Sequence, residues 1–210
     1  MAFTKDNPLR LGVLLSGGGR TMLNLHDRIR DGTLSARIEV VVSSRADAPG
    51  VERARQRGLR VVIVPRRELT EAEFQRRITA AVDGVDLVCM AGFLSLWTIP
   101  PDFAGRVMNI HPALLPAFGG PGMYGERVHR AVIASGAKET GCTVHFCDNE
   151  YDRGPIILQR RTAVLAGDTE GSLAARVFAQ ECLAYPEAVR LFAEGKLRME
   201  GGRAVIFDEP

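Results

Sequence analysis

The order of segments near the start of the chain constrains the fold more than any other feature. Residues 9–15 form a compact apolar run, residues 16–21 read Ser-Gly-Gly-Gly-Arg-Thr, and residues 22–30 have the spacing of an amphipathic helix. A strand, a glycine loop and a helix in this order are typical of the opening of a βαβ unit. We therefore expect a parallel α/β arrangement from the first strand onward.

The same alternation continues to residue 112. Residues 86–91 are almost entirely apolar, which is typical of a central parallel strand covered on both faces. One helix is expected near residues 50–57, and another follows Thr70-x-x-Glu73, which has the form of a capping box. Further strand patterns cover residues 38–43, 59–64 and 107–111. The sequence predicts an α/β fold with a Rossmann-like, mainly parallel sheet flanked by helices.

The pattern changes after residue 112. A stretch rich in Gly and Pro leads to a helix that ends near residue 135, and strand-like segments follow at residues 143–147 and 156–163. A long helix over residues 172–194 is expected to be interrupted by Pro186. The pair Gly201-Gly202 is a typical two-residue hairpin turn. We expect a smaller antiparallel carboxyl-terminal extension, within a single domain that spans residues 1–210.

Composition excludes several classes of protein. The 210 residues are 46% hydrophobic, with a formal net charge of +2, which fits one globular domain. The basic residues are dispersed, so no nucleic-acid surface is expected. No apolar run reaches the ~18 residues of a membrane span, and residues 1–8 lack the apolar segment of a signal peptide.

Cysteine usage indicates a reducing, cytoplasmic compartment. The four cysteines, at positions 89, 142, 147 and 182, form no Cys-x-x-Cys pair. Cys142, His145 and Cys147 match no common zinc spacing and lack a fourth ligand. We therefore expect no metal site.

The strand at residues 107–111 carries the strongest candidate for catalysis. Asn109 and His111 are two residues apart, so on a strand they share one face. Pro112 disfavours a helical conformation for His111 and places the end of the strand there, at the edge where open α/β sheets hold their active sites. A histidine transfers protons near neutral pH, and an amide can donate to an oxyanion. The alternative is a histidine that is merely hydrogen-bonded at a strand end.

The glycine loop at residues 16–21 is suited to a single phosphate. A dinucleotide fingerprint would require glycine at position 22, which is Met22, and a Walker loop would require a lysine. Arg20 and Thr21 could donate to an anion at the start of the helix. A tight turn without a ligand remains the alternative.

Two acidic residues stand out elsewhere. Asp152 lies in a polar loop just before the apolar run that begins at Gly154-Pro155, and a carboxylate near His111 would raise the pKa of that histidine. Glu181 falls on the apolar stripe of the last long helix, where a carboxylate needs a partner such as a substrate amine. Solvated positions are the alternative for both.

Taken together, five strings resemble the phosphoribosylglycinamide formyltransferase family, folate-dependent enzymes of purine biosynthesis. The resemblance runs from about residue 10 to residue 198. The strings are Ser16-Gly17-x-Gly19, Ala91-Gly92-Phe93, Asn109-Ile110-His111-Pro112-Ala113-Leu114-Leu115-Pro116, Gly141-Cys142-Thr143-Val144-His145-Phe146 and Asp152-x-Gly154-Pro155-Ile156-Ile157.

The resemblance implies a formyltransferase fold and a role for each matching residue. It implies a catalytic trio of Asn109, His111 and Asp152. It also implies that 10-formyltetrahydrofolate is the co-substrate, that glycinamide ribonucleotide is the formyl acceptor, and that no metal takes part. The implied ribonucleotide contacts are Gly19, Arg20, Thr21, Asn109 and Glu181. The implied folate contacts are Leu94, Ser95, Leu96, Trp97, Asp148, Asn149, Glu150 and Tyr151.

Some features depart from the family pattern. The family often has Ser-Asn where this chain has Arg20-Thr21, and residues 118–125 form a longer loop, as in one bacterial branch. The alternatives to formyl transfer are a 10-formyltetrahydrofolate hydrolase, which would carry an extra amino-terminal regulatory domain, and a non-catalytic phosphosugar-binding module. Methionyl-tRNA formyltransferase would need a tRNA-binding domain. We expect small-molecule partners, neither nucleic acid nor membrane, and a monomer or homodimer.

Overall fold

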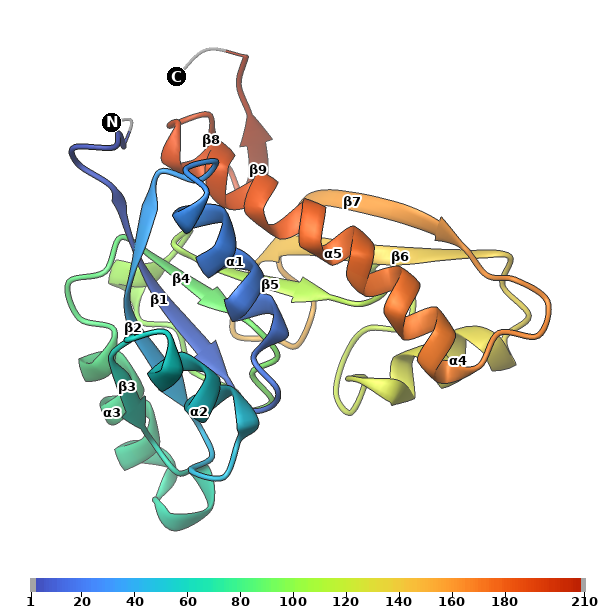
Figure 1. Cartoon of the computed structure of the whole chain (residues 1–210), viewed down its shortest axis with the longest axis horizontal. Coiled ribbons are helices and arrows are strands. Elements are labelled where there is room, and N and C mark those ends of the chain that lie inside the picture. Colours follow the sequence, from blue (N-terminus) through green and yellow to red (C-terminus); the bar gives the residue numbers. More distant parts are fainter. Residues whose placement is uncertain (1–2, 209–210) are drawn as a thin grey trace.

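A computed structural model of the chain describes residues 3–208 (Figure 1). Expectations that involve residues 1–2 and 209–210, namely the absence of a signal peptide and the full extent of the domain, therefore lie partly outside the described residues. Seven strands form one sheet in the order β3-β2-β1-β4-β5-β6-β7, and β8 and β9 form a second, two-stranded sheet. The strands are β1 (Leu9–Leu15), β2 (Ala36–Ser43), β3 (Val61–Ile63), β4 (Leu87–Met90), β5 (Val107–His111), β6 (Glu139–Phe146), β7 (Ile156–Ala163), β8 (Leu197–Glu200) and β9 (Arg203–Ile206).

The prediction of a mainly parallel sheet with an antiparallel extension is confirmed. Strands β1 to β5 pair in parallel, whereas β6 and β7 pair antiparallel and continue the same sheet beyond β5. The hairpin β8–β9 turns at Gly201-Gly202, as expected. The strand order reverses between β1 and β4, and such a switch point opens a crevice at the carboxyl ends of the two strands.

Helices cover both faces of the sheet. They are α1 (Arg20–Arg30), α2 (Pro49–Gln56), α3 (Glu71–Ala81), α4 (Glu126–Ala134) and α5 (Glu170–Ala193), with short 3₁₀ turns at Arg66–Glu68 and Pro101–Phe103. Thr70 and Glu73 form the expected capping box at the start of α3. No helix within residues 3–208 has the length and apolar character needed to cross a membrane.

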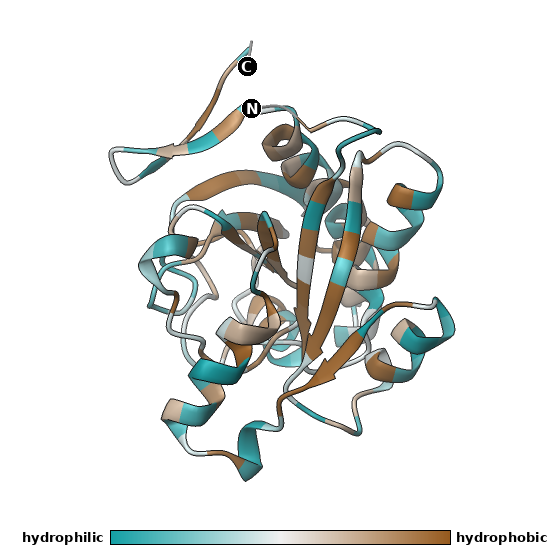
Figure 2. Cartoon of the chain, turned by 90° about the vertical axis from the view of Figure 1, so that its left-hand side faces the viewer, coloured by the Kyte–Doolittle hydropathy of each residue, from teal (hydrophilic) through white to brown (hydrophobic). Residues whose placement is uncertain are grey.

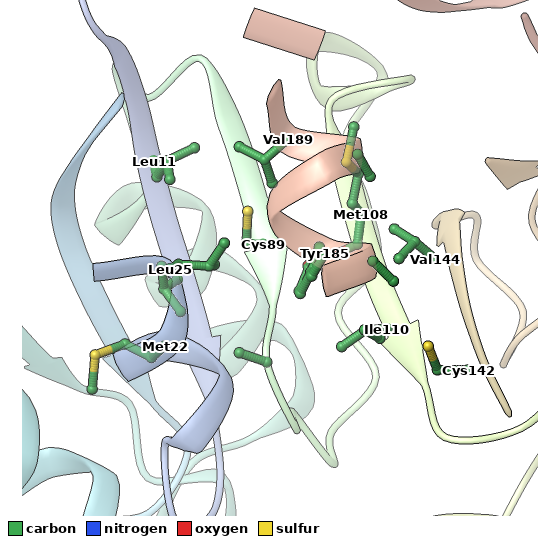
Figure 3. Packing of buried hydrophobic residues seen from close by; sticks show 14 of the residues in the cluster. Leu11, Met22, Leu25, Cys89, Met108, Ile110, Cys142, Val144, Tyr185 and Val189 are labelled. Carbon is green, nitrogen blue, oxygen red and sulfur yellow. Dashed lines mark hydrogen bonds between the residues drawn. The ribbon is translucent and has the colours of Figure 1, made fainter. Parts of the chain in front are cut away.

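Two apolar clusters hold the layers together. The larger packs α1 and α5 onto one face of the sheet, and Figure 3 shows Leu25 of α1 and Val189 of α5 beside strand residues such as Leu11 and Met108. The smaller packs α3 onto the opposite face. Figure 2 shows the apolar strands running through the middle of the molecule between more polar helices.

The expected break at Pro186 is wrong, because α5 is continuous from Glu170 to Ala193. Proline has no N–H to donate to the carbonyl four residues earlier, which here belongs to Cys182. The side-chain amide of Asn24 on α1 donates to that carbonyl instead, over 3.2 Å. A side chain of α1 thus supplies the hydrogen bond that Pro186 cannot donate, and α5 continues without a break. The hydroxyl of Tyr185 also fixes α5, since it lies 3.0 Å from the carbonyl of Met90 and 2.9 Å from that of Met108.

Candidate active site

A cavity of about 420 Å³ lies where β1, β4 and β5 end. The glycine loop at residues 17–21 forms one wall, and the segment after β4, residues 90–97, forms a second. The 116–125 loop, the 147–152 loop and one face of α5 complete the cavity. The crevice predicted by the strand order is therefore open, and it receives side chains from six separate segments.

Asn109 and His111 reach this cavity from β5, as their spacing predicted. The antiparallel neighbour β6 places His145 directly opposite Asn109 in the register. The amide nitrogen of Asn109 lies 3.2 Å from Nε2 of His145. Two strands thus bring an amide and two imidazoles to one point.

Asp152 completes the cluster from the loop between β6 and β7. Its Oδ2 lies 3.4 Å from Nδ1 of His111, and its Oδ1 lies 3.4 Å from the amide nitrogen of Asn109 and 3.7 Å from Nε2 of His145. Its backbone has φ 56°, in the left-handed region that non-glycine residues seldom adopt. Such conformations cost roughly 1–3 kcal/mol and cluster at functional sites. The loop holds the carboxylate there at the expense of local strain.

Carbonyl partners fix the proton positions on both histidines. A carbonyl oxygen only accepts, so Nε2 of His111 donates to the carbonyl of Phe118 over 2.8 Å, and Nδ1 of His145 donates to the carbonyl of Phe146 over 2.9 Å. His145 is then left with Nε2 as the acceptor for the Asn109 amide. His111 presents Nδ1 to Asp152, so a proton taken up by the ring would lie on Nδ1, facing the carboxylate.

The 116–125 loop touches both reacting groups. Besides the Phe118 carbonyl on His111, the backbone N–H of Gly120 donates to Oδ2 of Asp152 over 2.9 Å. Phe118 has φ 57°, again in the left-handed region. A Cβ at Gly119, between them, would overlap the side chain of Leu115 and come within 3.2 Å of the Cβ of Asp152. This longer loop therefore belongs to the site.

The electrostatics of His111 differ from the expectation. Burial lowers the pKa of its imidazole and outweighs the charge of Asp152, which acts to raise it, so the pKa lies below its ordinary value. Burial acts to raise the pKa of Asp152, but His145, His111 and the Gly120 amide outweigh it, and that pKa lies below its usual range. In the free protein the pair is a neutral imidazole beside a carboxylate. Asp152 acts on the pKa of His111 in the expected direction, yet the side chain is only 3% exposed and the net shift has the opposite sign.

The glycine loop presents the start of α1 to the cavity. Helix α1 begins at Arg20, two residues earlier than expected, because Gly19 caps it with φ 72°. A Cβ at Gly19 would come within 2.9 Å of the Cα of Gly50, so α2 packs tightly behind the loop. The guanidinium of Arg20 stacks 4.2 Å above the ring centre of Phe178. Gly19, Arg20 and Thr21 all line the cavity.

Glu181 reaches the same cavity from α5, one turn after Phe178. Burial raises the pKa of its carboxyl to about 7, and the charge of Arg20 acts against this rise. Close to neutral pH the group is poised between its neutral and charged forms. A substrate amine would supply the positive charge that a buried carboxylate needs.

The loops assigned to the folate line the opposite end, with two exceptions. Leu94, Ser95, Leu96, Asp148, Glu150 and Tyr151 border the cavity. Asn149 does not line it, because its Oδ1 accepts from the backbone N–H of Ile99 over 2.8 Å and ties the two loops together. Trp97 borders the cavity but is 1% exposed, since its ring packs against Phe103 and its indole N–H donates to Thr79 over 3.1 Å. Both residues thus shape the loops around the cavity, and their contact with the folate stays a prediction.

Sequence reasoning missed three side chains of the cavity. His145 belonged to one of the five family-like strings, and its pairing with Asn109 across β5 and β6 would have identified it. His129 of α4 and Phe178 of α5 also line the cavity. Both fall on apolar helix faces, so nothing in the sequence separates them from core residues. Within residues 3–208, no group of three or more His, Cys, Asp and Glu side chains is arranged to hold a metal ion.

Comparisons with known proteins agree with this geometry. Residues 9–189 match the family model described as formyl transferase. The chain is 36% identical over 202 residues to phosphoribosylglycinamide formyltransferase of Escherichia coli, covering 93% of this chain and 92% of the relative. The chloroplastic enzyme of the same name from Arabidopsis thaliana is 39% identical, and the match covers 90% of this chain and 67% of the plant protein.

Solved structures show the same likeness. Glycinamide ribonucleotide transformylase 1 from Symbiobacterium toebii superimposes with a TM-score of 0.87 at 43% identity, over 96% of this chain and 95% of the other. The family match covers most of the chain and includes the seven strands of the main sheet, the glycine loop and the loops around the cavity. The chain therefore belongs to the formyl transferase family.

Proposed function

We propose that this protein transfers the formyl group of 10-formyltetrahydrofolate to the amine of glycinamide ribonucleotide. The products are formylglycinamide ribonucleotide and tetrahydrofolate, in de novo purine biosynthesis. The observation that carries the proposal is the meeting of Asn109, His111 and Asp152 in one cavity with a glycine loop. The bacterial and plant relatives are phosphoribosylglycinamide formyltransferases, which supports formyl transfer to glycinamide ribonucleotide.

The chemistry can be derived from the residues in the cavity. The amine nitrogen attacks the formyl carbon, and the carbonyl oxygen takes up the electron pair of the broken π bond. The Asn109 amide stabilises this negative oxygen by hydrogen bonding, and the positive charge of His111 stabilises it once the imidazole has taken up a proton. The bond between the formyl carbon and N10 of the folate then breaks, and the amine loses a proton while N10 gains one. Mass and charge balance without any other reactant.

His111 and Asp152 manage that proton. A neutral imidazole can accept it from the attacking amine, and the negative oxygen beside it favours the imidazolium that results. Asp152 stabilises the imidazolium from 3.4 Å. The lowered pKa of free His111 therefore suits a group that must begin the reaction unprotonated.

The remaining walls supply binding. The backbone N–H groups at the start of α1, with Arg20 and Thr21, suit the phosphate of the ribonucleotide. Glu181 suits its amine before reaction. Exposed apolar side chains such as Leu94 and Tyr151, which are 48% and 40% exposed, suit the flat pterin ring. The whole chain acts in this proposal as one domain with small-molecule partners. A cytoplasmic location also fits, since Cys89, Cys142, Cys147 and Cys182 are free thiols.

One assay tests the proposal against its alternatives. The absorbance change of 10-formyltetrahydrofolate is followed with and without glycinamide ribonucleotide. We expect consumption to depend strictly on the ribonucleotide, with one formylated product per folate consumed. Equal consumption without the amine would identify a hydrolase. Binding of the ribonucleotide without consumption would identify a phosphosugar-binding module.

A further inference from the structure

His129 is a buried histidine of the cavity that the proposed reaction does not use. It lies on α4, is 5% exposed, and its ring forms part of the cavity wall. Its Nδ1 is fully enclosed and has no hydrogen-bond partner among residues 3–208. No ligand in the cavity can reach this enclosed nitrogen, so a contact from the cavity would use the other ring nitrogen, Nε2, which is not enclosed and makes no hydrogen bond within residues 3–208. The structure therefore leaves one interaction of His129 open.

The charged groups around His129 on balance disfavour its protonated form. Burial lowers its pKa most, and the charges of His111 and Arg20 act in the same direction. Glu170 and Glu126 act to raise that pKa. The carboxylate of Glu170 is occupied by Arg130, whose Nε and Nη2 donate over 2.6 and 3.0 Å. A neutral imidazole thus lies near the guanidinium of Arg20, and an anion between them would satisfy both.

The glycine loop supplies the other half of this arrangement. Gly19, Arg20 and Thr21 line the same cavity as His129 and belong to α1 or its cap, where N–H groups attract anions. The ring of Phe178 supports Arg20 from the α5 side. His129 and the start of α1 belong to different helices, yet both line this cavity, and the charge of Arg20 acts on His129.

We propose that His129 is a further ligand of the substrate phosphate, donating a hydrogen bond from α4 while Arg20 and the start of α1 bind from α1. The proposal rests on the proposed function for the identity of the ribonucleotide, but the group recognised is a phosphate monoester on ribose. A dianion beside His129 offsets the repulsion from Arg20 and favours the imidazolium. Binding of the phosphate is therefore accompanied by proton uptake near neutral pH.

The chain offers a matched control for the test. His26 on α1 also has an enclosed Nδ1 without a hydrogen-bond partner among residues 3–208, but it does not line the cavity. We compare His129→Gln with His26→Gln, because glutamine keeps a hydrogen-bonding amide but cannot be protonated. Ribose 5-phosphate and inorganic phosphate serve as probes, since neither can react. Binding is measured by calorimetry at one pH in two buffers with different enthalpies of ionisation.

We expect wild-type protein and His26→Gln to bind ribose 5-phosphate equally and to take up the same fraction of a proton. His129→Gln should bind it roughly tenfold to a hundredfold more weakly, the range for a lost hydrogen bond to a charged group, and should take up a smaller fraction of a proton than the wild type. Inorganic phosphate should show the same order. Equal affinity in the two variants would overturn the proposal. Weaker binding with unchanged proton uptake would also overturn it, since a group other than His129, such as Glu181, would then bind the proton.

Two additional measurements keep the result interpretable. If His129→Gln does not fold by circular dichroism, the ring signals of the histidines in wild-type protein can be titrated by NMR with and without ribose 5-phosphate. The pKa of His129 should rise on binding, and an unchanged value would contradict the proposal. Wild-type formyl transfer is measured separately. Its absence would refute the proposed function while a dependence of phosphate binding on His129 would still stand.

Discussion

The two ends of the cavity differ in how far their polar groups are already paired. At the end where we propose that the reaction takes place (the reaction end), Asn109, His111, His145 and Asp152 contact one another at distances of 3.2 to 3.7 Å, and backbone groups complete their bonding. At the end where we propose that the phosphate binds (the phosphate end), Arg20 stacks on the ring of Phe178, and His129 has an enclosed nitrogen without a partner among residues 3–208. Burial raises the pKa of the Glu181 carboxyl to about 7, against the charge of Arg20, so this group is only partly ionised near neutral pH.

This difference indicates two tasks. A reaction end that is bonded before substrate arrives needs little rearrangement as charge develops, which is how preorganised sites lower barriers. A phosphate end with unsatisfied groups gains its interaction energy when the substrate binds. Substitutions at the reaction end should therefore lower kcat, whereas those at the phosphate end should raise KM for the ribonucleotide.

Asp152→Asn tests the reaction end most severely. The substitution keeps the size of the side chain but removes the charge that stabilises the His111 imidazolium. We expect kcat to fall by roughly two to four orders of magnitude, the usual scale for acid–base groups, with KM changed much less. Loss of the charge also lowers the pKa of His111 further, so the acidic limb of the rate profile should move to lower pH. Near-normal turnover in a protein folded by circular dichroism would show that Asp152 takes no part.

Gly119→Ala tests whether the 116–125 loop is part of the reaction end. A methyl group there would overlap Leu115 and push on Asp152, displacing the Phe118 and Gly120 groups that hold His111 and Asp152. Small displacements of reacting groups are costly, so kcat should fall roughly tenfold to a hundredfold. Gly171→Ala is the control, because a Cβ there meets no atom closer than 3.9 Å. Unchanged kcat in Gly119→Ala would remove the loop from the site.

Arg20→Met tests the phosphate end without disturbing the loop backbone. Gly19 is less suitable, because a side chain there would press on Gly50 behind the loop. Loss of a charged donor should raise KM for the ribonucleotide roughly tenfold, while KM for the folate and kcat stay close to wild type. Arg28→Met, at the other end of α1 in an exposed pair with Asp31, is the matched control. An equal rise for both substrates would contradict the division into two ends.

The sequence predicted what depends on local pattern. The alternation of residues 107–111 was enough to place Asn109 and His111 on one face at the end of β5. The glycine loop and the order of strands then placed a crevice beside them. These features follow from backbone geometry that repeats over a few residues.

The remaining features depend on contacts between distant segments. The burial that lowers the pKa of His111 comes from the tertiary fold, so the charge of Asp152 alone led to the wrong net direction. Trp97 and Asn149 resemble ligand-binding residues in a polar loop, yet one packs into the core and the other ties two loops together. The left-handed conformation of Asp152 has no signature in its own residue type beyond a modest preference.

Glu181→Gln should give the smallest effect and the most specific one. The folded protein keeps this carboxyl protonated up to a pKa of about 7, whereas the unfolded chain loses the proton at about 4.3. Between these values the folded state binds more protons, so the free energy of unfolding of the wild type decreases as pH rises and then levels off. Glutamine is neutral throughout and escapes this loss. The variant should therefore match the wild type at pH ~4 and exceed it at pH ~8, by several degrees in Tm, since 1 kcal/mol corresponds to roughly 2–4 °C in a domain of this size. Glu187→Gln is the control, because Glu187 lies on the same helix but pairs with Arg160 over 2.6 Å at the surface, and its stability should not diverge from wild type in this way.

Substrate binding should be weakened where stability is gained, because only a charged carboxylate attracts the amine. KM for the ribonucleotide should rise in Glu181→Gln at the higher pH and stay near wild type at the lower one. Parallel melting profiles for wild type and Glu181→Gln would mean that Glu181 ionises normally. The contrast between the two ends would then rest on His129 and Arg20 alone.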